Sequence, residues 1–175
     1  VGSEMCIRDR IKVRFATKED AKHISDICSE AWKVTYADIC SRDYIDKVIE
    51  EFYNVERIAK ESSESSPHWH GYMVAHENQK ILGCVGGAID GEIGLIYVLY
   101  VDPKHKGQGV GSALLDFLTN HQKENYGITR QEVFVTTGNM MGIPFYEKIG
   151  FEIVEVVPNW VDKSEGTQNK YQRLV

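Results

Sequence analysis

The sequence lacks long apolar runs, cysteine pairs and an excess of basic residues, and each absence excludes a class of protein. No apolar stretch approaches the roughly 20 residues that a membrane-spanning helix needs. The four cysteines show no C-x-x-C spacing, which argues against a disulfide framework or a zinc site and favours free thiols in a reducing cytoplasm. The net charge of -6 disfavours nucleic acid as a partner, because phosphate backbones attract basic surfaces.

What is present is the composition of a globular protein, with 42% hydrophobic and 26% charged residues in a chain of 175. This length fits one domain with a single core. Residues 1–10 lack the apolar centre of a secretion signal and show no pattern typical of a helix or strand. We interpret them as a leader or an expression remnant, and we expect a single domain over residues 11–175.

The first half of the expected domain is mainly helical. A short alternating strand at 11–16 is followed by a capping-box spacing and by apolar residues at helical intervals, which predict a helix over 18–34. A second helical pattern covers residues 44–60. The serine-rich segment 61–71 predicts a solvated loop.

The second half changes to a pattern typical of a sheet. Strands are predicted at residues 71–77, 81–89, 93–101, 132–137, 151–157 and 170–175. The strand IGLIYVLYV, at 93–101, is almost wholly apolar, so we expect it to be central and buried on both faces. Helices are expected after residue 109 and over 142–149. The resulting order, β-α-α-β-β-β-α-β-α-β-β, predicts an α/β domain with a mixed sheet.

Three alternating glycines lie where the apolar strand gives way to a helix, in the segment LYVDPKHKGQGVGSALL at 99–115. Glycine reaches positive φ at no steric cost, and the first N–H groups of a helix have no partner within the helix. Such a turn gathers free amides and the partial positive charge of a helix N-terminus around an anion. It predicts a cradle for a phosphate or diphosphate.

Other phosphate-binding motifs fit this turn less well. The spacing of a P-loop is absent, and the dinucleotide fingerprint requires a glycine or alanine where the chain has Ser112. A dinucleotide oxidoreductase is therefore disfavoured but stays an alternative at this point, to be distinguished by comparing the binding of NADH and acetyl-CoA.

A second segment, NMMGIPFYEKIGF at 139–151, follows the glycine turn after an intervening helix and strand. Together the two segments resemble the acyl-CoA-binding motif and the second signature of the GCN5-related N-acetyltransferases (GNAT superfamily). The resemblance implies a mixed, mostly antiparallel sheet of about seven strands flanked by about four helices. It also implies transfer of the acetyl group of acetyl-CoA, as co-substrate, to an amine, with no metal.

The resemblance also implies roles for individual residues. It assigns the acetyl-CoA contacts to Leu99, Tyr100, Val101, Lys106, Gly107, Gly109, Val110, Gly111, Ser112 and Asn139. The amides of the turn would hold the diphosphate, and the strand backbone would pair with the pantetheine arm and polarise the acetyl carbonyl. Tyr146, the assigned catalytic residue, would lie near the leaving sulfur. Lys106 stands where arginine or glutamine is usual, and Gly142 where alanine is usual; Lys106 keeps the charge without the fork.

The general base is not identified by the sequence. Leu95 occupies the strand position where many members of the family carry glutamate, and leucine cannot accept a proton. Glu92, Tyr97, Glu30 and Asp38 are the alternatives. A non-catalytic acyl-CoA-binding regulatory module is therefore the alternative function.

The acceptor is expected to be a primary amine of a small molecule or a peptide, and the acidic balance favours a polyamine or another cation. Trp32 and Tyr36 lie four residues apart on one helical face, which fits either substrate contact or core packing. The loop that carries Trp160 and Asp162 is a second candidate wall. We assign the H-x-H pair, His68 and His70, to the surface of a loop, because no third metal ligand has suitable spacing. A homodimer is compatible with the sequence.

Overall fold

The computed structural model describes residues 10–175, and the rest of the expected leader lies outside the described residues. Its centre is one seven-stranded sheet with the strand order β1-β2-β3-β4-β5-β7-β6. The strands are β1 (Lys12–Phe15), β2 (Tyr72–Glu77), β3 (Lys80–Asp90), β4 (Ile93–Val101), β5 (Arg130–Thr136), β6 (Glu152–Pro158) and β7 (Thr167–Leu174). Every neighbouring pair is antiparallel except β4 and β5. The predicted mixed, mostly antiparallel sheet of about seven strands is confirmed.

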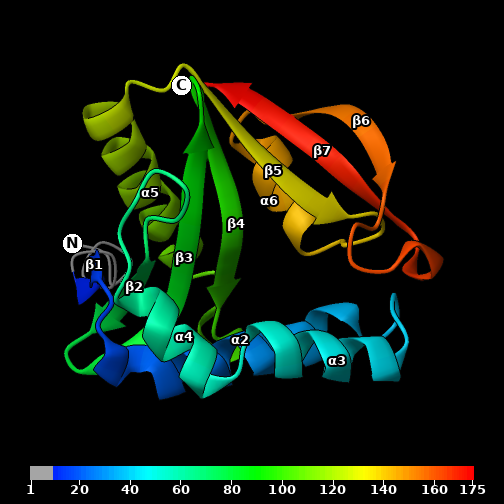
Figure 1. Ribbon diagram of the computed structural model, residues 1–175, viewed down its shortest axis with the longest axis horizontal. Helices are drawn as coiled ribbons and strands as arrows, with labels where there is room; N and C mark the ends of the chain where they lie inside the picture. Colours follow the sequence, from blue (N-terminus) through cyan, green and yellow to red (C-terminus); the bar gives the residue numbers. More distant parts are fainter. Residues whose placement is uncertain (1–9) are drawn as a thin grey trace.

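Helices cover both faces of this sheet (Figure 1). The α-helices of the described residues are α2 (Ala21–Tyr36), α3 (Arg42–Phe52), α4 (Val55–Ser62), α5 (Val110–Tyr126) and α6 (Gly142–Lys148). The first three pack on one face, where Ile24 and Cys28 meet Val98. The other two pack on the opposite face, where Leu114 and Val133 lie in a second cluster. None of these helices is both long and apolar enough to cross a membrane.

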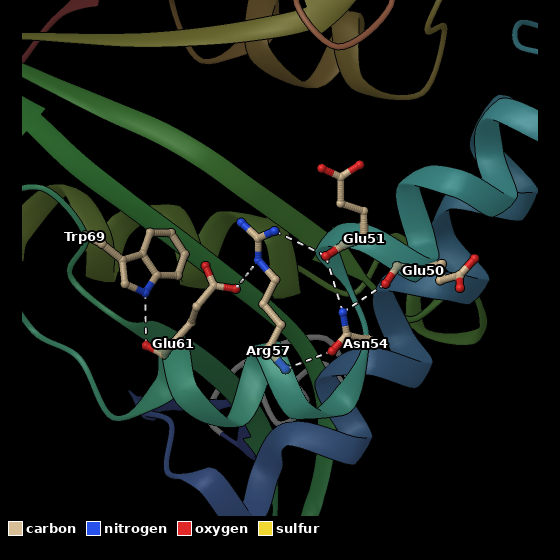
Figure 2. Close-up of polar contacts among 6 residues, drawn as sticks. All are labelled: Glu50, Glu51, Asn54, Arg57, Glu61 and Trp69. Carbon is tan, nitrogen blue, oxygen red and sulfur yellow. Dashed lines mark hydrogen bonds and ion pairs between the residues drawn. The ribbon is translucent and has the colours of Figure 1, made fainter.

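The single helix predicted over 44–60 is wrong, because the chain forms α3 and α4 with a break between them. Tyr53 leaves the helical conformation, and Asn54 begins the next helix by accepting a hydrogen bond from the Arg57 N–H at 2.8 Å. The Asn54 amide also donates to the carbonyl of Glu50 at 2.8 Å (Figure 2). The apolar period continues across the break, so periodicity alone could not reveal it.

The expectation that β4 is buried on both faces is also wrong, because Tyr97 is 56% exposed. Gly86 of β3 pairs with Val98 and Gly87 pairs with Ile96, which leaves Tyr97 as the extra residue of a β-bulge. The bulge reverses the alternation, so Ile96 faces the α5 layer while Val98 faces the α2–α4 layer.

The loop between α4 and β2 was predicted to be solvated, yet two of its side chains point inward. Trp69 lies over Gly86, where a Cβ atom would collide with its ring, and its Nε1 donates to the Glu61 carbonyl at 2.9 Å (Figure 2). His70 is 1% exposed and stacks on Tyr126. The loop is thereby fixed against both layers of the molecule.

Candidate active site

A cleft opens where β4 and β5 separate. The two strands pair only from Ile93–Ile96 to residues 130–133, and beyond that point they diverge (Figure 1). The cleft has a volume of about 440 Å³. The predicted site residues that line it are Tyr36, Leu99, Tyr100, Val101, Lys106, Gly107, Gly109, Val110, Gly111, Ser112, Asn139 and Tyr146. Of the residues assigned above to acetyl-CoA, to catalysis or to the acceptor as an aromatic pair, Trp32 alone does not line the cleft.

The glycine turn forms one end of the cleft. Gly107 and Gly109 have φ values of 78° and 84°, in the left-handed region that glycine alone adopts freely, and Gly109 is the N-cap of α5. Within residues 10–175, the N–H groups of 109–112 donate no hydrogen bond. The space beside the Gly107 Cα is open. Four unpaired amides at a helix N-terminus, next to open space, fit an anionic diphosphate.

Lys106 reaches across the cleft from this turn. Its Nζ lies 3.4 Å from the Met141 Sδ, which comes from the segment before α6. Burial lowers the pKa of the Lys106 ammonium. The side chain thus places a basic group on the wall of the same cleft as the free amides, where it can bind an anion.

Asn139 is buried at the opposite wall, where it caps α6. Its Oδ1 accepts hydrogen bonds from the N–H groups of Met141 and Gly142, at 3.1 and 2.9 Å. A Cβ atom at Gly142 would lie 2.9 Å from the Asn139 Nδ2. The glycine that departs from the usual alanine therefore leaves room for this orientation of Asn139, and the cap in turn orients the helix that carries Tyr146.

Tyr146 is 6% exposed and its ring is held by edge contacts with Phe145 and Phe151, at centroid distances of 5.2 and 5.4 Å. Burial raises the pKa of the Tyr146 phenol well above its usual range, and burial raises the pKa of Tyr36 as well. Both phenols therefore stay protonated at neutral pH, and each keeps a hydroxyl proton that it can donate to a ligand.

The predicted aromatic pair divides between two environments. Tyr36 lines the cleft, whereas Trp32 lies behind it, with its ring 4.2 Å from that of Tyr36 and 6.5 Å from that of Tyr100. Trp32 belongs to the core on the α2–α4 face of the sheet. Core packing thus describes the position of Trp32, and only Tyr36 could touch a substrate directly.

The candidate bases do not gather at the reaction centre. Glu30, Asp38 and Glu92 are exposed and lie outside the cleft wall, while Tyr97 is on it. Leu95 is half-buried and, like Glu30, Asp38 and Glu92, does not line the cleft.

Sequence reasoning missed Glu132, the register partner of Leu95 across β4 and β5. It is 8% exposed, and its Oε1 accepts a hydrogen bond from Gln172 at 2.8 Å and lies 3.5 Å from the Lys170 Nζ. Strand alternation could place Glu132 on one face of β5. The register that sets it beside Leu95 is not encoded locally.

The β6–β7 loop lies against α3 without reaching the cleft. Trp160 is 72% exposed and its ring contacts Phe52, while the Asp162 carboxylate accepts hydrogen bonds from Ser164. Neither residue lines the cleft. Both predicted wall residues therefore lie outside it.

The assignment of His70 to a loop surface is wrong. Its Nδ1 lies 2.9 Å from the Ser66 carbonyl oxygen, and its Nε2 lies 3.4 Å from the Gln122 Nε2, in the layer between α5 and the sheet. His68 is exposed on the other side of the loop. Across residues 10–175, no three His, Cys, Asp or Glu side chains are grouped as metal ligands would be.

Part of the chain resembles proteins of known family. Residues 68–153 match the model of the family described as acetyltransferase (GNAT) domain. A spermidine N(1)-acetyltransferase of Thermoplasma acidophilum is 28% identical over 144 residues, which are 82% of this chain and 89% of that protein. An uncharacterized N-acetyltransferase of Methanocaldococcus jannaschii is 32% identical over 98 residues, which are 52% of this chain and 43% of that protein.

Solved structures show the same fold. The PaiA N-acetyltransferase of Thermoplasma acidophilum, crystallised in complex with coenzyme A, superposes with a TM-score of 0.81 at 24% identity, covering 94% of this chain and 99% of that one. Ard1 of Thermoplasma volcanium superposes with a TM-score of 0.68 at 22% identity, covering 95% and 98% of the two chains. Residues 68–153 of this chain thus match the GNAT acetyltransferase domain, and the chain as a whole shares the fold of the solved N-acetyltransferases.

Proposed function

We propose that this protein transfers the acetyl group of acetyl-CoA directly to a primary amine of a small polyamine-like molecule or of a peptide. The observation that carries the proposal is the row of unpaired amides at the start of α5, which opens into the cleft between β4 and β5. The relative that acetylates spermidine supports an amine as acceptor. Free thiols favour a cytoplasmic enzyme.

The residues present fit acetyl-CoA along the whole cleft. The amides of 109–112 and the Lys106 ammonium would hold the diphosphate. The edge of β4 that faces β5 has no strand partner beyond Ile96, so the backbone of Leu99–Val101 is free to pair with the pantetheine arm. Bound acetyl-CoA supplies the activated thioester. An N–H group of this strand edge would stabilise the negative charge that develops on the carbonyl oxygen.

Tyr146 would act on the sulfur. A phenol kept protonated by burial donates a hydrogen bond to the leaving sulfur and so stabilises charge there. Full transfer of its proton is uphill, since a thiol's ordinary pKa is about 8.5 and that of a tyrosine is about 10 even before burial.

The amine must lose a proton before it attacks, because an alkylammonium has a pKa of about 10.4. No carboxylate of the described residues lines the cleft. We infer that this proton leaves to water at the mouth, beside the exposed ring of Tyr97. Such a path needs no side-chain base at Leu95.

The direct test is the release of coenzyme A thiol with a panel of amines: spermidine, a short monoamine, a peptide with a free N-terminus and a lysine side-chain analogue. We expect thiol release that depends on both acetyl-CoA and amine. Tight binding of acetyl-CoA with no release for any amine would instead establish the non-catalytic acyl-CoA-binding module.

A further inference from the structure

We propose that the acceptor is a linear polyamine, and that a hollow next to the cleft holds its far ammonium group beside Asp90. This inference rests on the proposed acetyl transfer and adds a binding site for the part of the acceptor that does not react. Five observations support it: the position of the hollow, the aromatic ring that it shares with the cleft, the distribution of charge, the contacts on the side of α3, and the distance along β4.

The hollow lies on the β3–β4 hairpin and measures about 520 Å³. Its floor is formed by Ala88 and Leu95, which are register partners, and its rim by Pro67, Asp90 and Tyr97. Gly94 faces Gln122 of α5, so the neighbouring Leu95 points to the α2–α4 face of the sheet. An apolar floor with an acid at its rim fits an alkyl chain that carries an ammonium group.

Tyr97 connects the hollow with the cleft, because it lines both. As the extra residue of the β-bulge it projects from the sheet, and its ring is nearly parallel to that of Trp69, at 12° and a centroid distance of 6.5 Å. Trp69 is itself anchored to the Glu61 carbonyl (Figure 2). Trp69 thus supports the Tyr97 ring from behind, and the exposed face of an aromatic ring attracts cations.

The charges around the hollow favour a cation. His68 and Asp90 are the titratable side chains besides Tyr97 on its wall, and no lysine or arginine lines it. Within residues 10–175 the Asp90 carboxylate has no hydrogen bond or ion pair. On the other side of Leu95, Glu132 is already paired with Lys170. Asp90 is therefore the carboxylate that a bound ammonium group would meet.

On the side of α3, the α2–α3 turn and α3 itself are joined to the β6–β7 loop by side-chain contacts. The Ser41 Oγ donates to the Glu165 carboxylate, and the Asn159 Nδ2 donates to the Tyr44 hydroxyl at 3.0 Å. None of these residues lines the cleft. The hollow, in contrast, shares Tyr97 with the cleft wall, so we place the extended part of the acceptor past Tyr97 along β4.

The dimensions fit a triamine. Asp90 pairs with Ile93, four residues before Tyr97, which corresponds to about 13 Å at about 3.3 Å per strand residue. A molecule of the length of spermidine spans a comparable distance, whereas a short monoamine cannot reach from the cleft to Asp90.

The test compares the kinetics of Asp90→Asn with spermidine and with butylamine, at saturating acetyl-CoA. We expect the KM for spermidine to rise about fivefold, the effect of losing one partly exposed ion pair, with kcat/KM for butylamine unchanged. Glu92→Gln is the matched control, since Glu92 is an exposed acid on the same hairpin outside the hollow. It should leave both amines unaffected.

A second variant, Leu95→Phe, fills the floor of the hollow and should weaken spermidine selectively. An equal effect of Asp90→Asn on both amines, or none on spermidine, overturns the polyamine site. Turnover of a peptide without turnover of spermidine also overturns it while the proposed acetyl transfer stands. Failure of every amine in the panel overturns the proposed transfer itself.

Discussion

The two ends of the cleft are formed by different parts of the chain, backbone amides at one end and side chains at the other. The end at α5 consists of backbone, with four unpaired amides from consecutive residues and two glycines whose positive φ values aim them. The wall near Tyr97 consists of side chains from β4 and α2, and the hollow beyond it adds Pro67 and His68 from the loop before β2. Contacts between distant segments hold this loop, such as that of Trp69 with Glu61.

This difference determines what each end tolerates. An amide is present whatever side chain the residue carries, so the α5 end depends on backbone conformation and accepts many substitutions that preserve it. The Tyr97 end can change its ligand by replacing one side chain, provided that the supporting contacts remain. One cleft can thus keep a constant donor site while its acceptor site varies.

The largest effect is expected at the backbone end, from Gly109→Val. The φ of 84° strains a β-branched residue by roughly 1–3 kcal/mol, and relief of that strain would turn the amides away from the cleft. We expect the KM for acetyl-CoA to rise at least tenfold. Gln108→Ala is the control, since it changes a side chain in the same turn without a positive φ, and it should have little effect. A KM for acetyl-CoA that Gly109→Val leaves unchanged would mean that the amides do not bind the diphosphate.

Tyr146→Phe should have the next largest effect, at the point where the two ends meet. We expect kcat to fall about tenfold to a hundredfold, because a positioned proton or hydrogen-bond donor contributes on that scale, while acetyl-CoA affinity stays the same. Since burial raises the pKa of Tyr146, wild-type kcat should show no loss from ionisation of this phenol up to pH 9. Steady-state kinetics over pH 6–9 measure both, and an unchanged kcat removes Tyr146 from the mechanism.

Asn54→Ala tests the scaffold of the side-chain end. Loss of the N-cap of α4 should cost about 1 kcal/mol and lower Tm by about 2–4 °C, with the KM for acetyl-CoA unaffected. Lys60→Ala, at an exposed position of the same helix, serves as the control for thermal denaturation. An equal loss of stability in both variants would show that the cap contributes nothing beyond helix propensity.

The smallest effect is expected from pH, through the histidine that anchors the loop before β2. Burial lowers the pKa of His70 below its ordinary value of 6.5, so the unfolded chain binds a proton more readily than the folded one. Its contribution to stability is complete above pH 6.5 and is lost as the pH falls below that value toward the lowered pKa. Tm measured between pH 7.5 and 5.5 should fall less steeply in His70→Gln than in the wild type. His23→Gln, at an exposed histidine, should keep the wild-type slope, and a slope unchanged in His70→Gln would contradict the assignment.

The sequence allowed the α5 end to be predicted and left the other end hidden, for a physical reason. A glycine turn followed by a helix is a local arrangement, so Gly107, Gly109 and the amides after them could be located from spacing alone. The neighbourhood of Leu95 and Glu132 depends on the register of two strands separated by a helix. The bulge at Tyr97 likewise depends on pairing with a glycine of another strand.

Helix breaks and buried loops were missed for the same reason. Asn54 interrupts a continuous apolar period with a capping hydrogen bond, which a hydrophobic pattern does not contain. The burial of His70 depends on Gln122 and Tyr126, from a helix about fifty residues further along the chain. A serine-rich segment predicts solvent exposure from its own composition, and that prediction fails where a distant segment packs against it.

The short parallel pairing of β4 with β5 makes this junction, at the edge of the cleft, a weak connection within the sheet, and we call it the seam. Only four register pairs join these two strands, so the hairpins on either side are connected more weakly to each other than within themselves. Amides along this seam should exchange their hydrogens with solvent sooner than those inside the flanking hairpins. A ligand that bridges both strands would slow that exchange. The two halves of the sheet would then be held together most firmly while that ligand is bound.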